Sequence, residues 1–232
     1  MIFPNNIKCI FCGDELNKDS LYSCCDNCND NLPFISFSCS RCGLPITEED
    51  SGGCPDCKIN NYNFVSSKSV FIYEKEIVKI IYSFKYSGKK YLAKSLARFL
   101  VDLYSVSNLS VDYVTSVPMF YKKEKQRGYN QSKLLADEFS KITNIKFLPL
   151  CSKVKDIPSQ TSLSYKDRKE NVKGCFDFNK EYNKDIKNKN ILIIDDLLTT
   201  GSTASELSKV LLEAGAKECY VLTLARAVVD KN

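Results

Sequence analysis

The chain has 232 residues, of which 44% are hydrophobic and 26% charged, a composition typical of a globular protein with one sizeable domain and a smaller one. It has no histidine, which excludes the commonest general base and the commonest neutral metal ligand. The formal charge is −5 over residues 1–60 and +10 over residues 61–232, and a basic second part suits an anionic ligand such as a polyphosphate or a nucleic acid.

The first residues, "MIFPNNIKCIFCG", have no basic region followed by an apolar core, so they do not resemble a secretory signal. No apolar run approaches the roughly 20 residues that a membrane-spanning helix needs. We therefore expect a cytoplasmic protein without membrane insertion. In that compartment thiols stay reduced, so the twelve cysteines favour metal binding over disulfides.

Eight of the cysteines form four CxxC pairs within residues 1–60. The motif "CIFCGDEL" followed by "CDNC" is echoed about 30 residues later by "CSRCGLPI" followed by "CPDC", which indicates duplication of one small unit. Two CxxC turns supply four thiolates for a closed structural Zn²⁺ site, and the metal would provide the folding energy of so small a unit. The predicted ligands are Cys9, Cys12, Cys25, Cys28, Cys39, Cys42, Cys54 and Cys57.

The duplication favours sequential pairing, with the first four cysteines on one ion and the last four on the other. Cross-braced alternation remains open, and Cys24, next to Cys25, competes for a ligand position. A disulfide-linked knot and an iron–sulfur site are the alternative interpretations. Three further cysteines have no partner nearby in the sequence and are interpreted as small buried hydrophobes: Cys151, Cys175 and Cys219.

Residues 61–232 alternate between predicted strands and helices. A short strand near residue 70 precedes two amphipathic helices on either side of "KYSGKK". Their apolar faces carry Ile77, Ile80, Ile81 and Phe84 in the first helix, and Leu92, Leu96, Phe99 and Leu103 in the second. "DYVTSVP" reads as a buried strand that Pro118 stops, and "MFYKKEKQRGYNQ" reads as a basic loop.

A helix whose apolar face carries Leu135, Phe139 and Ile142 follows, and then "KFLPLC", a strand candidate. Residues 151–174 are polar and aperiodic, which predicts an active-site lid. "ILIID" and "CYVLTLAR" are continuous apolar runs typical of central parallel strands. Together these elements predict an α/β sheet with right-handed crossovers.

The stretch "ILIIDDLLTTGSTASEL" carries the strongest functional signal. Ligands of open parallel sheets bind at the carboxyl ends of the strands, where we expect Asp195 and Asp196. These acids suit sugar hydroxyls or a hydrated Mg²⁺. The turn that follows, at a helix N-terminus, suits a phosphate, and it comprises Thr199, Thr200, Gly201, Ser202 and Thr203.

In the same helix, Thr203 and Glu206 form a possible capping box, and Gly215 is a suitable stop. The motif has three other interpretations. The metal-binding strand of an ATPase requires a G-x-x-x-x-G-K-[S/T] motif elsewhere, which the sequence lacks. A phospho-acceptor strand lacks the threonine–glycine turn. An N-capped helix with solvated carboxylates is the purely structural alternative.

The motif resembles the 5-phosphoribosyl 1-pyrophosphate (PRPP) motif of type I phosphoribosyltransferases. "SVPMFYKKEKQRGYNQSKLLA", "QTSLSYKDRKENVKGCF" and the cysteine-rich front end narrow the resemblance to the ComF (ComFC/GntX-like) family, associated with DNA uptake in natural competence. The resemblance covers essentially the whole chain. It implies a double zinc ribbon over residues 1–60 and a type I phosphoribosyltransferase fold over residues 61–232.

The resemblance also assigns roles to residues. It implies that Asp195 and Asp196 bind the ribose hydroxyls near Mg²⁺, that Thr199–Thr203 bind the 5′-phosphate, and that Arg127 and Gly128 belong to the pyrophosphate loop. Asp195, Asp196 and Arg127 are the catalytic candidates. The flexible catalytic loop corresponds to the segment with Gln160, Arg168, Asn171 and Gly174, and Lys85 adds charge from "KYSGKK".

Three functions compete at this point. The first is a competence-type factor that binds PRPP and single-stranded DNA and works with a partner ATPase or helicase and other competence proteins. Basic stretches that contain aromatic residues suit single strands. The second is an active phosphoribosyltransferase that transfers ribose 5-phosphate from PRPP to a small amine or nucleobase and releases pyrophosphate. The third is a regulator that senses PRPP without turning it over.

Overall fold

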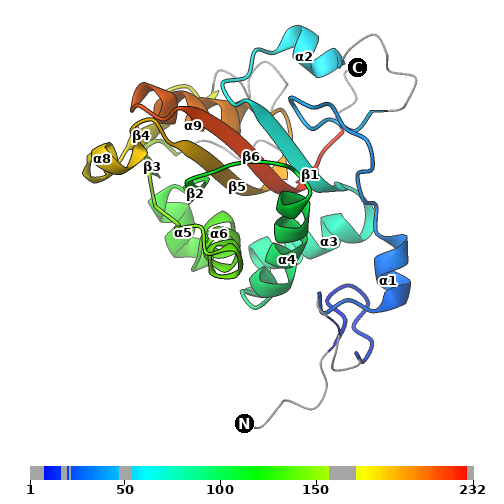
Figure 1. Ribbon diagram of the computed structural model, residues 1–232. Coiled ribbons are helices and arrows are strands. Elements are labelled where there is room, and N and C mark those ends of the chain that lie inside the picture. Colours follow the sequence, from blue (N-terminus) through cyan, green and yellow to red (C-terminus); the bar gives the residue numbers. More distant parts are fainter. Residues whose placement is uncertain (1–7, 17–19, 21, 47–53, 157–170, 229–232) are drawn as a thin grey trace.

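Four parallel strands form the central sheet of the molecule. A computed structural model of the chain describes residues 8–16, 20, 22–46, 54–156 and 171–228 (Figure 1). The strand order is β1-β6-β5-β2, and every neighbouring pair is parallel. The strands are β1 (Ser66–Ile72), β2 (Tyr113–Ser116), β5 (Asn190–Leu198) and β6 (Glu218–Arg226).

Apolar side chains of the central strands divide between two cores. In β5, Ile191 and Ile193 belong to one core and Leu192 and Ile194 to the other, and all four are fully buried. Successive side chains of a strand point to opposite faces, so a strand segment covered on both faces forms a continuous apolar run. The predicted α/β fold class is confirmed.

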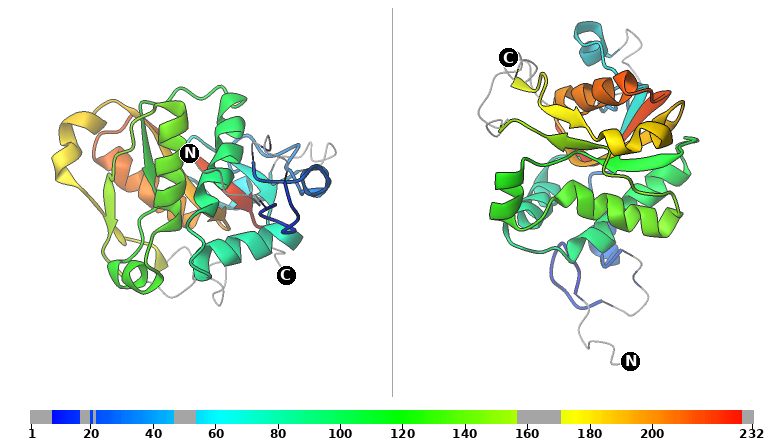
Figure 2. Two further views of the ribbon diagram at one scale, coloured as in Figure 1. Left: turned by 90° about the horizontal axis from the view of Figure 1, so that it is seen from below. Right: turned by 90° about the vertical axis from the view of Figure 1, so that its left-hand side faces the viewer.

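Helices cover both faces of this sheet, as the right-hand view of Figure 2 shows. One face carries α3 (Lys75–Tyr86), α4 (Leu92–Ser105) and α6 (Gln131–Thr143), which share a core with the sheet. The other carries α9 (Ser202–Glu213) and the antiparallel hairpin of β3 (Cys151–Lys153) and β4 (Phe176–Phe178). The shorter elements are α1 (Asp26–Asn31), α2 (Pro55–Ile59), α5 (Tyr121–Arg127), η2 (Lys180–Tyr182) and α8 (Asn183–Ile186).

The two amphipathic helices on either side of "KYSGKK" are confirmed as α3 and α4. All four apolar residues predicted for the first face are buried, and so are Leu92, Leu96 and Phe99 of the second. Leu103 is only partly buried, because it lies in the last turn of α4. The longest helix of the described part is α4, with 14 residues. No helix there is long and apolar enough to cross a bilayer.

Three local predictions were wrong. The basic segment before α6 is not a loop but contains the helix α5, which Gly128 ends in a left-handed conformation. Ile142 is 40% exposed, because α6 ends one residue later. "KFLPLC" forms no regular strand: Phe147 makes one bridge to Val114 of β2, and β3 begins only at Cys151.

The two cysteine-rich units lie against opposite faces of the sheet. Cys9, Cys24 and Leu32 of the first unit belong to the core shared with α3 and α4, whereas Cys42 of the second belongs to the core shared with α9. The connecting segment runs along the free edge of β1, where the Ile35 N–H donates to the Val70 carbonyl at 3.0 Å. Figure 1 shows the units far apart, near α1 and near α2. A domain boundary at residue 60 remains a prediction.

Candidate functional site

Asp195 and Asp196 lie inside β5 and not at its end, because β6 pairs with β5 as far as Leu198 and Arg226. The prediction that the two acids end the strand was therefore wrong. On the other side of β5, however, β2 stops at Ser116 opposite Ile194. The two carboxylates thus begin where β5 loses one neighbour, toward the carboxyl ends of the strands.

Asp196 forms a buried ion pair with Lys85 of α3. Its Oδ2 lies 2.7 Å from Lys85 Nζ, and only 4% of the Asp196 side chain and 19% of the Lys85 side chain are exposed. Burial by itself would lower the pKa of Lys85, but the negative charge of Asp196 outweighs it, and the net pKa is raised. The structure thus brings Lys85, the weakest assignment from the resemblance, into direct contact with the acidic pair.

Asp195 accepts two hydrogen bonds through one carboxylate oxygen. Ser132 Oγ, at the start of α6, donates to Asp195 Oδ1 at 2.6 Å, and the Asp196 N–H donates to the same oxygen at 2.9 Å. Burial and then the neighbouring charge of Asp196 raise the pKa of Asp195 to about 7. A cation bound beside Asp195 would favour the charged form of its carboxyl, so this carboxyl suits a metal ion or a ligand group that carries positive charge.

The turn Thr199–Thr203 connects β5 to α9, as the sequence predicts. Thr200 Oγ1 and Ser202 Oγ lie 2.9 Å apart, and Gly201 is the N-cap of α9 with a φ of +75°. The predicted capping box was wrong. The N-cap of α9 is Gly201, and the Ser202 N–H donates to Thr200 Oγ1 at 3.3 Å. Glu206 Oε1 accepts the N–H of Gly174 at 2.8 Å. Backbone amides at such a helix N-terminus favour an anion.

Tyr62 shapes this turn, and sequence reasoning did not find it. Its hydroxyl donates to the Thr200 carbonyl at 3.2 Å, and its ring packs directly on Gly201. A Cβ at position 201 would lie 2.8 Å from a ring carbon of Tyr62, so only glycine fits there. No local sequence signal marks Tyr62, because it is 138 residues away from Thr200 in the chain.

The "RGYNQ" segment joins α5 to α6 beside the acidic pair. Arg127 donates to Gln131 Oε1 at 2.6 Å, and its guanidinium lies 4.9 Å from the centre of the Tyr86 ring. Asn130 caps α6, and the Tyr129 hydroxyl donates to the Phe84 carbonyl. Because Ser132 follows directly, this segment holds the hydroxyl that binds Asp195; its role in pyrophosphate binding remains a prediction.

Of the four residues predicted for the flexible loop, Gln160 and Arg168 fall outside the described residues. Asn171 is exposed, and Gly174 has a φ of +59°. The base of the segment carries Lys153 of β3, which the sequence analysis missed. Burial lowers the pKa of Lys153, and the charges of Cys175 and Asp195 act in the opposite direction.

Each cysteine unit gathers its own four sulfur atoms, those of Cys9, Cys12, Cys25 and Cys28 and those of Cys39, Cys42, Cys54 and Cys57. Within each group all four sulfurs lie within 4.8 Å of one another. Three of the separations are 3.7, 3.7 and 3.3 Å, and sulfurs around a tetrahedral Zn²⁺ lie about 3.8 Å apart when each Zn–S bond is about 2.3 Å. The grouping is sequential, and the donor set fits zinc.

The remaining cysteines are free thiols and not ligands. Cys24 is 6% exposed and lies outside both groups, and burial raises its pKa to about 12. Burial likewise raises the pKa of Cys151 and Cys219 to about 12 and that of Cys175 to about 11. Cys175 and Cys219 are buried as predicted, whereas Cys151 is partly exposed at the start of the β3 strand.

We expect the purified protein to carry close to two zinc ions per chain, since both units present four thiolates. Cys42→Ser should remove one ion and unfold its unit, because the metal provides the unit's folding energy. Metal content measured by mass spectrometry checks both numbers, with Cys24→Ser as the control that keeps both ions. A protein without zinc, or one indifferent to chelators, would contradict the prediction.

Comparison with known proteins places the chain in a family. Residues 60–227 match the family described as PRTase-CE. The chain belongs to this PRTase-CE family. It is also 29% identical over 96% of its length to competence protein F of Haemophilus influenzae, covering 98% of that protein. It is 27% identical to the DNA utilization protein YhgH of Escherichia coli, over 88% of this chain and 90% of that one.

Two further similarities complete the comparison of this PRTase-CE protein. Competence protein ComFC of Streptococcus pneumoniae is 27% identical over 95% of this chain and 100% of its own length. Among solved structures, glutamine PRPP amidotransferase from B. subtilis matches with a TM-score of 0.37 and 23% identity, over 59% of this chain and 26% of that one. The two relatives with competence names thus align with 95–96% of this chain, and the DNA utilization protein aligns with 88% of it.

Proposed function

We propose that this protein acts in the uptake or use of DNA and that its sheet domain binds PRPP. The first part rests on the relatives named for competence and DNA utilisation, which align with nearly the whole chain. The second part rests on one observation: the acidic pair of β5, with Lys85 in contact, directly precedes the turn at the N-terminus of α9.

The proposed PRPP site divides the ligand between these two features. Thr199–Thr203 would hold the 5′-phosphate through backbone amides and hydroxyls at the helix N-terminus. Asp195 and Asp196 would hold the ribose hydroxyls and a hydrated Mg²⁺. Lys85 supplies positive charge in contact with Asp196, and Lys153 of β3 would add to it, which suits a ligand whose pyrophosphate is strongly anionic.

Catalysis by this site is the second candidate function. In a transfer, the lone pair of an acceptor would form a bond to the anomeric carbon while the bond to the pyrophosphate oxygen breaks, and pyrophosphate would leave with that electron pair. Mg²⁺ would stabilise the leaving group when bound. The chain's own contribution would be positioning and positive charge, with little acid–base chemistry, so the lack of histidine is no obstacle. The acidic pair supports catalysis as a candidate function. A protein that only senses PRPP would need the same PRPP site but no site for an acceptor.

The test is a calorimetric titration of PRPP with Mg²⁺ into the protein and into the Asp195→Asn/Asp196→Asn variant. We expect saturable binding to the native protein and at least a tenfold loss in the variant, since both sugar contacts and metal ligands are removed. Lys187→Met, a change on the distant surface loop before β5, is the control that keeps affinity. Pyrophosphate release with candidate acceptors then separates a transferase from a sensor. Absent binding to the native protein would refute the proposed site.

We further propose that the outer face of α3 contributes to single-stranded DNA binding. Tyr82 and Tyr86 are 61% and 60% exposed, and their ring centres lie 4.8 Å apart. Arg127 covers the Tyr86 ring, and Lys79 is exposed one turn before Tyr82. Exposed aromatic faces beside cations are the usual platform for unpaired bases. Lys85 of the PRPP site follows on the next face of the same helix.

Fluorescence anisotropy with a labelled oligonucleotide tests this surface. We expect salt-dependent binding, because phosphate contacts release counterions, and a loss of about tenfold or more in Tyr82→Ala/Tyr86→Ala. Phe37→Ala, an aromatic residue with 59% exposure in the acidic part, is the matched control. Equal affinities for all three proteins would exclude the α3 face. The chain lacks a nucleotide-binding G-x-x-x-x-G-K-[S/T] motif, so we also propose a partner ATPase or helicase. We propose a cytoplasmic location as well, because metal-binding cysteines suit a compartment that keeps thiols reduced.

A further inference from the structure

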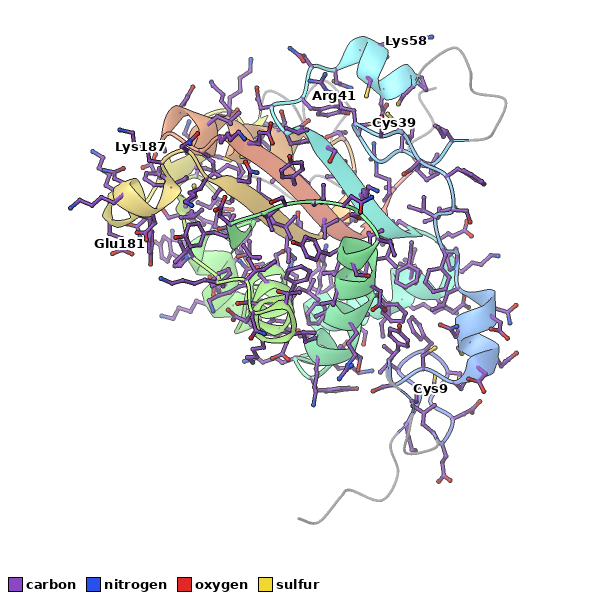
Figure 3. All side chains as sticks on the ribbon, in the orientation of Figure 1. Cys9, Cys39, Arg41, Lys58, Glu181 and Lys187 are labelled. Atoms are coloured by element: carbon purple, nitrogen blue, oxygen red, sulfur yellow. The ribbon has the colours of Figure 1, made fainter. Side chains whose placement is uncertain are left out.

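The second cysteine unit is joined to the segment that packs on the turn Thr199–Thr203. Arg41 stands between its ligand cysteines Cys39 and Cys42, and Arg41 Nη2 donates to the Tyr62 carbonyl at 3.0 Å and to Asn61 Oδ1 at 3.1 Å. Figure 3 shows Arg41 beside Cys39, close to α2 and the start of β1. Since Tyr62 contacts both Thr200 and Gly201, the unit reaches the turn through one intervening residue.

A second connection is a buried ion pair. Asp56, which lies between the ligands Cys54 and Cys57, accepts from Arg226 Nη2 at 2.7 Å, with 7% and 1% of the two side chains exposed. Arg226 Nη1 also donates to the carbonyl of Leu198 at 3.3 Å. Leu198 is the last residue before the turn, so the unit is fixed to the turn's entrance as well.

A third connection reaches the far end of the turn. The N–H of Asn63 donates to Ser205 Oγ at 3.0 Å, and Asn63 Nδ2 donates to the Ser205 carbonyl at 3.1 Å. Ser205 lies in the first turn of α9 and donates its own N–H to the Gly201 carbonyl at 2.8 Å. The unit therefore reaches Leu198, just before the turn, through Arg226. The segment that follows the unit contacts Thr200 within the turn and Ser205 just after it.

The first cysteine unit, its duplicate, makes contacts of another kind. Tyr22 stacks on Phe99 of α4 with ring centres 4.6 Å apart and donates to Asp102 of the same helix. Ser95 Oγ of α4 donates to Ser23 Oγ at 3.0 Å. These contacts end on the helical layer across the sheet from α9, as Figure 1 shows. The chain thus contains an internal control for any effect of the second unit.

We propose that the second cysteine unit, and not the first, positions the turn Thr199–Thr203 for the phosphate of its ligand, with Arg41, Tyr62 and the Asp56–Arg226 pair as positioning residues. Metal loading of that unit then controls phosphate affinity. The physical reason is that Tyr62, which Arg41 of the unit holds, contacts Thr200 and Gly201 of the turn. Arg226, which Asp56 of the unit holds, contacts Leu198 at the entrance of the turn. This inference rests on the proposed binding of phosphate by the turn, and it adds that the second cysteine unit holds the turn in place.

Hydrogen exchange of the full-length protein, followed by mass spectrometry on peptides covering residues 199–206, tests the positioning without any ligand. We expect Cys42→Ser to speed exchange of these amides at least tenfold, while Cys12→Ser, the matched loss in the first unit, leaves them unchanged. Arg41→Ala should have the same direction of effect with both zinc ions retained. Unchanged exchange in Cys42→Ser, or equal effects of Cys42→Ser and Cys12→Ser, would overturn the proposal.

Tyr62→Phe is the conservative variant that separates positioning from stability. It keeps the ring packed on Gly201 and stacked on Phe64 but removes the hydrogen bond to Thr200. We expect affinity for PRPP to fall about threefold to tenfold. The melting temperature should fall by no more than roughly 2–4 °C, because one intramolecular hydrogen bond contributes about 1 kcal/mol to stability. If the native protein does not bind PRPP, the proposed function fails while the exchange result stands. If it binds and Tyr62→Phe binds equally, this hydroxyl does not position the turn.

Discussion

Lys85→Met is expected to lower the free energy of unfolding by about 3–5 kcal/mol at pH 8, a fall in melting temperature of roughly 10 °C for a chain of this size. The substitution removes the ammonium group that lies 2.7 Å from Asp196 Oδ2 and leaves a buried carboxylate without its ion-pair partner. Asp195, next to it, adds like charge. Without Lys85, the negative charges of the two neighbouring acids are no longer offset by an ammonium group, and this costs free energy.

Chemical denaturation at pH 8 and pH 5 measures the effect. The loss should be smaller at pH 5, because burial raises the pKa of Asp195 to about 7 and the protonated Asp195 no longer adds like charge beside Asp196. Lys79→Met on the same helix is the control, because the Lys79 side chain is 78% exposed and its pair with Glu76 is solvated, so a change below about 0.5 kcal/mol is expected. The double variant Lys85→Met/Asp196→Asn should recover part of the stability. Native stability in Lys85→Met at pH 8 would show that the pair does not hold the site.

Asp195→Asn is expected to stabilise the protein above pH 7 while removing a proposed ligand contact. The folded state raises the pKa of Asp195 from 3.8 to about 7, so between these values the folded chain holds a proton that the unfolded chain has lost. Stability therefore falls as pH rises through this window. Asparagine avoids that cost and keeps an oxygen for Ser132 and the Asp196 N–H.

A shift of this size corresponds to about 4 kcal/mol at most, and partial solvation of the site reduces the expected gain to about 1–3 kcal/mol at pH 8. The gain should vanish below about pH 4, where both states are protonated. Asp112→Asn is a control of opposite sign, because hydrogen bonds from Lys189 and the Asn190 N–H lower the pKa of Asp112. Unfolding curves at pH 4, 6 and 8 check both signs, and a loss of stability in Asp195→Asn at pH 8 would contradict the prediction.

The sequence by itself determined the features whose cause is local. Spacing within the chain groups the eight ligand cysteines, and continuous apolar runs identify β5 and β6, because a strand buried on both faces is apolar over most of its length. The order of two acids and a threonine–glycine turn identifies the candidate site. In each case neighbours in sequence are neighbours in space.

The tertiary structure decided which contacts distant groups make in that site; the resemblance indicated only that Lys85 adds charge. Lys85 and Asp196 are 111 residues apart, and Tyr62 and Thr200 are 138 apart, so no local pattern joins them. The strand β5 continues past the two acids because β6 supplies hydrogen bonds there. The low strand propensity of aspartate predicts instead that the strand ends at the acids. Duplicated cysteine units look equivalent in sequence, yet they pack on opposite faces of the sheet, since each meets a different set of apolar side chains there.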